Sequence, residues 1–116
     1  MIIGGKFQGK RDYAERLYGE FSAVSDLEHQ DAIIPGLVVN VHEGVRRGMK
    51  CEYFSERLSV LRHCVIICEE ICGGIVPVDP AERSWRDETG KVYQLLAREA
   101  DIVDRILVGL PLRLKG

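Results

Sequence analysis

The sequence predicts an α/β fold with a mostly parallel sheet, formed as one domain over residues 1–116. Three observations predict it: a short strand, glycine-rich loop and helix at the N-terminus; an unbroken apolar run at residues 64–68; and a long amphipathic helix that starts near residue 79. Strands that alternate with helices are typical of layered folds in which helices cover a parallel sheet. A length of 116 residues suits a single core.

The first half of the chain contains several short elements. Met1–Ile3 predicts a brief strand, after which Gly4 and Gly5 open a loop. Residues 11–18 place apolar side chains on one face, which indicates a helix that ends at Gly19. The other elements expected here are a short strand around 21–24, a buried strand at 37–39, and helices at 41–49 and 55–62.

The second half has clearer signals. The run at residues 64–68 (Cys-Val-Ile-Ile-Cys) contains no polar residue, as expected of a central parallel strand covered on both faces. Asp79, Pro80 and Glu82 provide an N-cap, a first-turn proline and a capping-box glutamate, so a helix should begin there and continue to about Ala100. Its buried stripe is expected to contain Trp85, Thr89, Val92 and Leu96. Residues 102–108 should form the final strand and residues 110–115 an extended tail.

Composition excludes several kinds of partner. A net charge of −2 gives no long-range attraction to nucleic acid or to anionic lipid, so neither partner is expected. No apolar run approaches the ~20 residues that span a bilayer, and no signal peptide is visible, so we expect a cytoplasmic protein. The four cysteines form no Cys-x-x-Cys pair, which favours reduced, buried thiols and no metal site. A chain of this size could bury more apolar area in an oligomer.

The N-terminal loop has the spacing of a phosphate-binding motif. Gly4, Gly9 and Lys10 follow the pattern G-x-x-x-x-G-K, in which backbone N–H groups face phosphate oxygens and the lysine adds a positive charge. The next position, where a Ser or Thr hydroxyl would hold magnesium, is Arg11, and a guanidinium cannot bind a cation. The alternative is a glycine-rich turn without a ligand.

A second candidate region follows the central strand. Residues 70–77 form a glycine-containing loop, and Arg83 and Arg86 follow it on the predicted helix. In an open α/β sheet, ligands bind beyond the carboxyl ends of the strands, where this loop should lie. Glu69 and Glu70 would either meet magnesium through water, act as a base, or simply cap the strand in solvent. The histidines at 29, 42 and 63 have no metal-ligand spacing, and Arg46, Arg47 and Lys50 are expected to form a solvated helix face.

Both motifs, together with two C-terminal patterns, resemble one enzyme family. These patterns are R-x-W-R-D-x-x-G-K-x-x-Q-x-x-A from Arg83 to Ala97 and G-x-P-L-R-L-K from Gly109 to Lys115. The chain resembles the bifunctional adenosylcobinamide kinase and adenosylcobinamide-phosphate guanylyltransferase of cobalamin biosynthesis. The resemblance covers residues 65–115 and about fifteen residues at the N-terminus. It implies a P-loop-type three-layer sandwich, reduced in size, as a single nucleotide-binding domain.

The resemblance also implies a function and a set of site residues. The family uses a nucleoside triphosphate, GTP or ATP, to phosphorylate adenosylcobinamide, then transfers GMP through a guanylated histidine; homo-oligomers are expected. Lys10 and Glu70 would be the catalytic residues. The nucleotide-binding residues would be Gly4, Gly5, Gly9, Lys10, Arg11, Gly74, Arg83 and Arg86.

Three departures from the family bear on its chemistry. Family members are usually longer, and no residue here matches the guanylated histidine; His29 lies nearest in order. Asn40 stands where the family has an acidic residue, so Arg11 and Asn40 replace both usual magnesium ligands. The sequence therefore favours two hypotheses: a shortened kinase-like member that binds a nucleoside triphosphate, or a catalytically inactive nucleotide- or corrinoid-binding module that regulates or assembles with other proteins.

Overall fold

The computed structural model, which describes residues 1–71 and 79–116, confirms the α/β class. The N-terminal signal gives β1 (Ile2–Gly4) and α1 (Lys10–Tyr18), and Gly19 caps α1 as expected. The middle of the chain forms β2 (Val24–Asp26), β3 (Gly36–Val39), α2 (Val41–Arg46), α3 (Cys51–Ser55) and α4 (Leu58–Leu61). The remaining elements are β4 (Cys64–Glu69), α5 (Pro80–Glu99), β5 (Val103–Leu107) and β6 (Leu110–Lys115).

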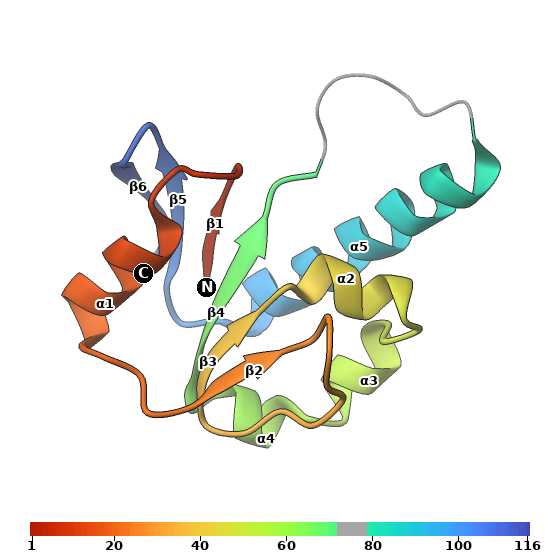
Figure 1. Ribbon diagram of the computed structural model, residues 1–116, viewed down its shortest axis with the longest axis horizontal. Coiled ribbons are helices and arrows are strands. Elements are labelled where there is room, and N and C mark those ends of the chain that lie inside the picture. The colour runs from red at the N-terminus through yellow and green to blue at the C-terminus, as the bar shows by residue number, and fades with distance from the viewer. Residues whose placement is uncertain (72–78) are drawn as a thin grey trace.

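The strands form one sheet in the order β2-β3-β4-β1-β5-β6. The first five are parallel, and β6 pairs with β5 in the antiparallel direction. Because β3, β4 and β1 are parallel neighbours, their carboxyl ends meet at one edge of the sheet, where ligands bind in folds of this kind. This edge carries the loop between β1 and α1 (Figure 1).

Helices cover both faces of the sheet, which gives the expected three layers (Figure 1). On one face, Ala14 of α1 packs against Ile2, Leu37, Ile67 and Ile106. On the other face, a larger cluster joins the sheet to α2–α5 and includes Phe54, Leu61, Val92 and Leu96. No helix among the described residues is long and apolar enough to cross a membrane.

Most predicted elements are confirmed, with shifted bounds. The Asp79 side chain accepts a hydrogen bond from the Ala81 N–H at 3.0 Å and so caps α5 as predicted. Thr89, Val92 and Leu96 are buried, and Trp85 is half-buried at the end of the same stripe. The free thiol of Cys68 is fully buried, and this burial raises its pKa to about 12, which fits the prediction of a cysteine that acts as a small apolar residue.

Three predictions about elements were wrong. Residues 110–115 form strand β6 rather than a tail, so β5 is not the last strand; the pairing is held partly by Arg113, whose guanidinium reaches Asp104 of β5. The helix expected at 55–62 is shorter, since α4 covers only Leu58–Leu61, and α3 at Cys51–Ser55 is a helix that the sequence did not predict. The early strand lies at Val24–Asp26 instead of 21–24, because it pairs in register with Leu37–Val39.

Candidate functional site

The conformation of the loop between β1 and α1 depends on its glycines. A Cβ atom at Gly4 would lie 2.7 Å from the carbonyl oxygen of Ile106, so only glycine fits where the loop leaves the sheet. Gly9 adopts a left-handed conformation, with φ of 83°, and directly precedes Lys10, the first residue of α1. The Lys10 ammonium donates a hydrogen bond to the Gly5 carbonyl at 2.6 Å and thus lies across the loop.

The charge of Lys10 is tuned by its surroundings. Partial burial lowers the pKa of Lys10, and the negative charge of Glu69 opposes this shift. A protonated lysine supplies the positive charge that phosphate oxygens require. Lys10 is therefore a cation placed at the start of a helix, where the backbone N–H groups also favour an anion.

A cavity of about 270 Å³ opens beside this loop. Residues 7–12 form one wall, and Val39 of β3 and Ile67 of β4 form the other. The cavity therefore lies at the carboxyl edge of the central strands, where the sequence places its nucleotide site. Gly5, Gly9, Lys10 and Arg11 all belong to this loop or to the first turn of α1.

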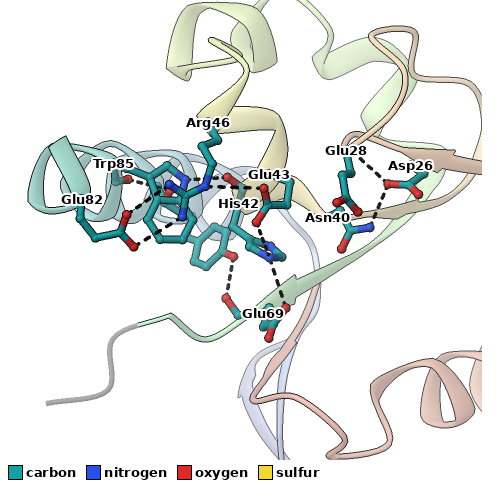
Figure 2. Close-up of polar contacts among 11 residues, drawn as sticks. Asp26, Glu28, Asn40, His42, Glu43, Arg46, Glu69, Glu82 and Trp85 are labelled. Carbon is teal, nitrogen blue, oxygen red and sulfur yellow. Dashed lines mark hydrogen bonds and ion pairs between the residues drawn. The ribbon is translucent and has the colours of Figure 1, made fainter. Parts of the chain in front are cut away.

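The two positions that replace the usual magnesium ligands do not fit a resident metal ion. Arg11 is exposed, and its Nε donates to Glu15 at 3.3 Å, one turn further along α1. Asn40 follows β3 in a left-handed conformation, and its amide Nδ2 donates to Asp26 of β2 at 2.8 Å (Figure 2). A guanidinium cannot bind magnesium, and Asn40 offers only a neutral amide oxygen in place of a carboxylate, so these two positions do not supply the usual ligands.

The two glutamates at the end of β4 have different partners. Glu70 forms an ion pair with Arg105 of β5, with its Oε1 2.7 Å from the guanidinium Nε. Glu69 pairs in register with Gly4, at the start of the loop between β1 and α1, and its carboxylate lies 3.2 Å from His42 Nε2. Of the two, Glu69 is thus the carboxylate directed toward α2.

His42 is the buried member of a polar cluster at the same edge of the sheet (Figure 2). Its side chain is about 10% exposed, with Nε2 3.6 Å from Glu43 Oε1 in addition to its contact with Glu69. The Trp85 indole donates to the His42 carbonyl at 2.7 Å, and Arg46 stacks over Trp85 while binding Glu82. The sequence predicts no role for His42, which has no metal-ligand spacing to another histidine. The available signal was its place in the first turn after β3.

The other arginines that the sequence singles out lie on α5 and at the end of α2. Arg83 and Arg86 lie in the first two turns of α5, at the end of that helix that projects away from the loop joining β1 to α1 (Figure 1). Gly74 lies outside the described residues. Arg46, Arg47 and Lys50 are exposed, as expected, and Arg47 also binds the Leu27 carbonyl and the Asp31 carboxylate.

A comparison with protein-family models gives one match, which covers residues 40–114. The matching model is described as cobinamide kinase / cobinamide phosphate guanyltransferase. The chain belongs to this family. The match starts at Asn40 and therefore does not include the loop between β1 and α1. The glycine pattern of that loop is thus an observation separate from the family match. No curated protein matches the chain significantly.

Membership places the chain among kinase- and transferase-type proteins of cobalamin biosynthesis. Proteins of this family bind nucleotides, and the carboxyl-edge cavity and loop described above are the features of this chain that suit a nucleotide. The individual roles of the predicted site residues and the homo-oligomeric state stay predictions.

Proposed function

We propose that the chain binds the triphosphate of GTP or ATP at Gly4, Gly5, Gly9 and Lys10 and transfers the terminal phosphoryl group to the hydroxyl of adenosylcobinamide. The observation that carries this proposal is the cavity beside Gly9 and Lys10, at the carboxyl edge of the sheet in a member of the cobinamide kinase family. The loop supplies backbone N–H groups and one lysine, which are the groups that hold phosphates in such sites.

Phosphoryl transfer depends mostly on positioning and on charge stabilisation. The substrate hydroxyl oxygen forms a bond to the terminal phosphorus, the bond from that phosphorus to the bridging oxygen breaks, and a nucleoside diphosphate leaves. Lys10 would offset the charge on the phosphate oxygens. The hydroxyl proton needs a carboxylate; Glu69 is a better candidate than Glu70, since Arg105 already binds Glu70 in two hydrogen bonds.

A binding module without transfer activity is the second candidate function. It is favoured by Arg11 and Asn40, which leave the chain without ligands at the two usual magnesium positions. In that case the loop would hold a nucleotide or a corrinoid for regulation or assembly, and no phosphorylated product would form.

The test combines binding with product analysis. Purified protein is titrated with ATP and with GTP by calorimetry, then incubated with adenosylcobinamide and each nucleotide, with the corrinoid analysed by mass spectrometry. Lys10→Ala should weaken nucleotide binding about 10- to 100-fold, because it removes a charge-assisted hydrogen bond worth roughly 1.5–3 kcal/mol. Lys6→Ala is the matched control, since Lys6 is an exposed lysine of the same loop.

The outcomes separate the two candidate functions. A phosphorylated corrinoid that disappears in Lys10→Ala supports the kinase. Binding that depends on Lys10 but gives no product supports the module, and a gain of product in Arg11→Ser would show that the missing hydroxyl limits transfer. If neither nucleotide binds, or if Lys6→Ala weakens binding as much as Lys10→Ala, the proposed phosphate site is wrong.

A further inference from the structure

The polar side-chain contacts of His42 are made by one ring nitrogen, Nε2. His42 is the second residue of α2 and is 8% exposed, with its backbone carbonyl bound by Trp85 of α5. Its Nδ1 is buried and has no hydrogen-bond partner among the described residues, whereas Nε2 faces the carboxylates of Glu69 and Glu43 at 3.2 and 3.6 Å. The shorter contact, to Glu69, is therefore the principal polar interaction of the ring.

Glu69 lies between this histidine and the phosphate loop. It ends β4 beside Gly4, and its backbone carbonyl accepts a hydrogen bond from the Tyr93 hydroxyl at 2.6 Å. Its charge acts on Lys10, since it raises the pKa that burial lowers. The Lys10 ammonium nevertheless donates to the Gly5 carbonyl at 2.6 Å, while Oε2 of Glu69 lies against His42.

A carboxylate that is free to turn toward Lys10 would weaken a phosphate site in two ways. It would pair with the ammonium that phosphate oxygens need, and it would repel the like charge of the phosphates. A hydrogen bond from the other side keeps the carboxylate in a fixed position. His42 can provide that bond through Nε2–H, with Nδ1 unprotonated.

We infer that His42 is a positioning residue, which holds the Glu69 carboxylate away from the Lys10 ammonium and so leaves that ammonium available for the phosphates of a nucleotide. The inference rests on the proposed function, because it concerns the same phosphate site. It adds a residue for which the sequence predicts no role.

Two substitutions distinguish the hydrogen bond from the presence of a polar side chain. His42→Gln places an N–H donor near the position of Nε2, and His42→Asn places one near the buried Nδ1. His63→Asn is the matched control, because His63 is exposed and precedes the amino end of β4, at the opposite edge of the sheet. The double variant His42→Asn with Glu69→Gln removes the carboxylate that would otherwise turn.

Two measurements are made on each variant, after circular dichroism has confirmed its fold. The pKa of Lys10 is measured in the nucleotide-free protein by NMR of labelled lysine Cε, and ATP affinity is measured by calorimetry. His42→Asn should raise the pKa of Lys10 and weaken ATP binding about tenfold. His42→Gln and His63→Asn should stay within about twofold of the wild-type affinity, and the double variant should regain most of the affinity that His42→Asn loses.

The results separate failure of this inference from failure of the proposed function. A folded His42→Asn variant with the wild-type Lys10 pKa and ATP affinity would overturn the inference. Should that variant not fold, a raised Lys10 pKa in His42→Gln would overturn it instead, and a wild-type value would support it. If the wild-type protein binds neither ATP nor GTP, the phosphate site fails, while the Lys10 pKa of the variants still decides whether His42 controls Glu69.

Discussion

Replacing Asp104 by asparagine is expected to destabilise the protein, because this carboxylate joins three elements. Asp104 lies on β5 and is 1% exposed. Its oxygens accept hydrogen bonds from Arg113 of β6 at 2.5 Å and from the Tyr13 hydroxyl of α1 at 2.8 Å. Asparagine keeps the shape and one acceptor oxygen but loses the charge. Since a hydrogen bond to a charged group contributes roughly 1.5–3 kcal/mol, the expected loss is about 2 kcal/mol.

The same contacts predict how this loss depends on pH. Burial alone would raise the pKa of Asp104, but the hydrogen bonds from Arg113 and Tyr13 outweigh it and hold the pKa below its ordinary value of 3.8. A carboxyl group with a depressed pKa stabilises the fold fully above its unfolded-state pKa, and this stability is lost as pH falls through the folded-state value. The difference between wild type and variant should therefore be constant from pH 5 to 7 and shrink below about pH 3.8.

Urea unfolding, followed by circular dichroism at several pH values, measures both effects. At neutral pH the midpoint of thermal unfolding should also fall by about 8 °C, at roughly 4 °C per kcal/mol for a domain of this size. Asp101→Asn is the matched control, because Asp101 is an exposed aspartate just before β5. A loss below about 0.5 kcal/mol in the Asp104 variant, or a difference that persists unchanged at pH 3, would refute the reasoning.

Two further substitutions test the loop and the packing of α2 on α5. Gly4→Ala should lower the free energy of unfolding by roughly 1–3 kcal/mol, because its Cβ would lie 2.7 Å from the Ile106 carbonyl oxygen. Gly5→Ala is the control, since its Cβ would meet only a side chain at 3.6 Å. Equal melting temperatures for the two variants would contradict the prediction. Trp85→Phe should lower the free energy of unfolding by about 1 kcal/mol, since it removes the hydrogen bond to the His42 carbonyl. A thermal melt, followed by circular dichroism, that matches wild type would show that this bond adds no stability.

The sequence predicts the elements whose signals are local. The cap at Asp79 and the proline after it fix the start of α5 through contacts within one turn. The apolar run at residues 64–68 correctly predicts a strand in the sheet interior, because burial on both faces leaves no polar position. The glycines before Lys10 also act locally: the left-handed backbone at Gly9 favours glycine, so the loop can be predicted from these residues alone.

Elements and contacts that depend on distant residues could not be predicted in the same way. Strand β6 is stabilised by pairing with β5 and by the contact of Arg113 with Asp104, and nothing within residues 110–115 shows that partner. Residues 51–62 form two short helices, α3 and α4, instead of one helix at 55–62, and the two pack on different partners, α3 on α5 and α4 on β4. The contact between His42, in the first turn after β3, and Glu69, at the end of β4, joins residues 27 positions apart in the chain. Rules on the spacing of ligands along the sequence therefore do not predict it.

Sheet order changes how the loss of an acidic residue at Asn40 should be interpreted. Considered alone, Asn40 after β3 has an uncharged amide where the family has an acidic residue, so this position supplies no negative charge to the site. The strand next to β3 is β4, however, and β4 ends in Glu69, whose register partner is Gly4 at the start of the phosphate loop. A carboxylate therefore remains at the carboxyl edge, one strand closer to Lys10. An unrestrained carboxylate beside Lys10 would compete with phosphate for the lysine, so a site with its carboxylate on β4 needs a group such as His42 that holds this carboxylate in place.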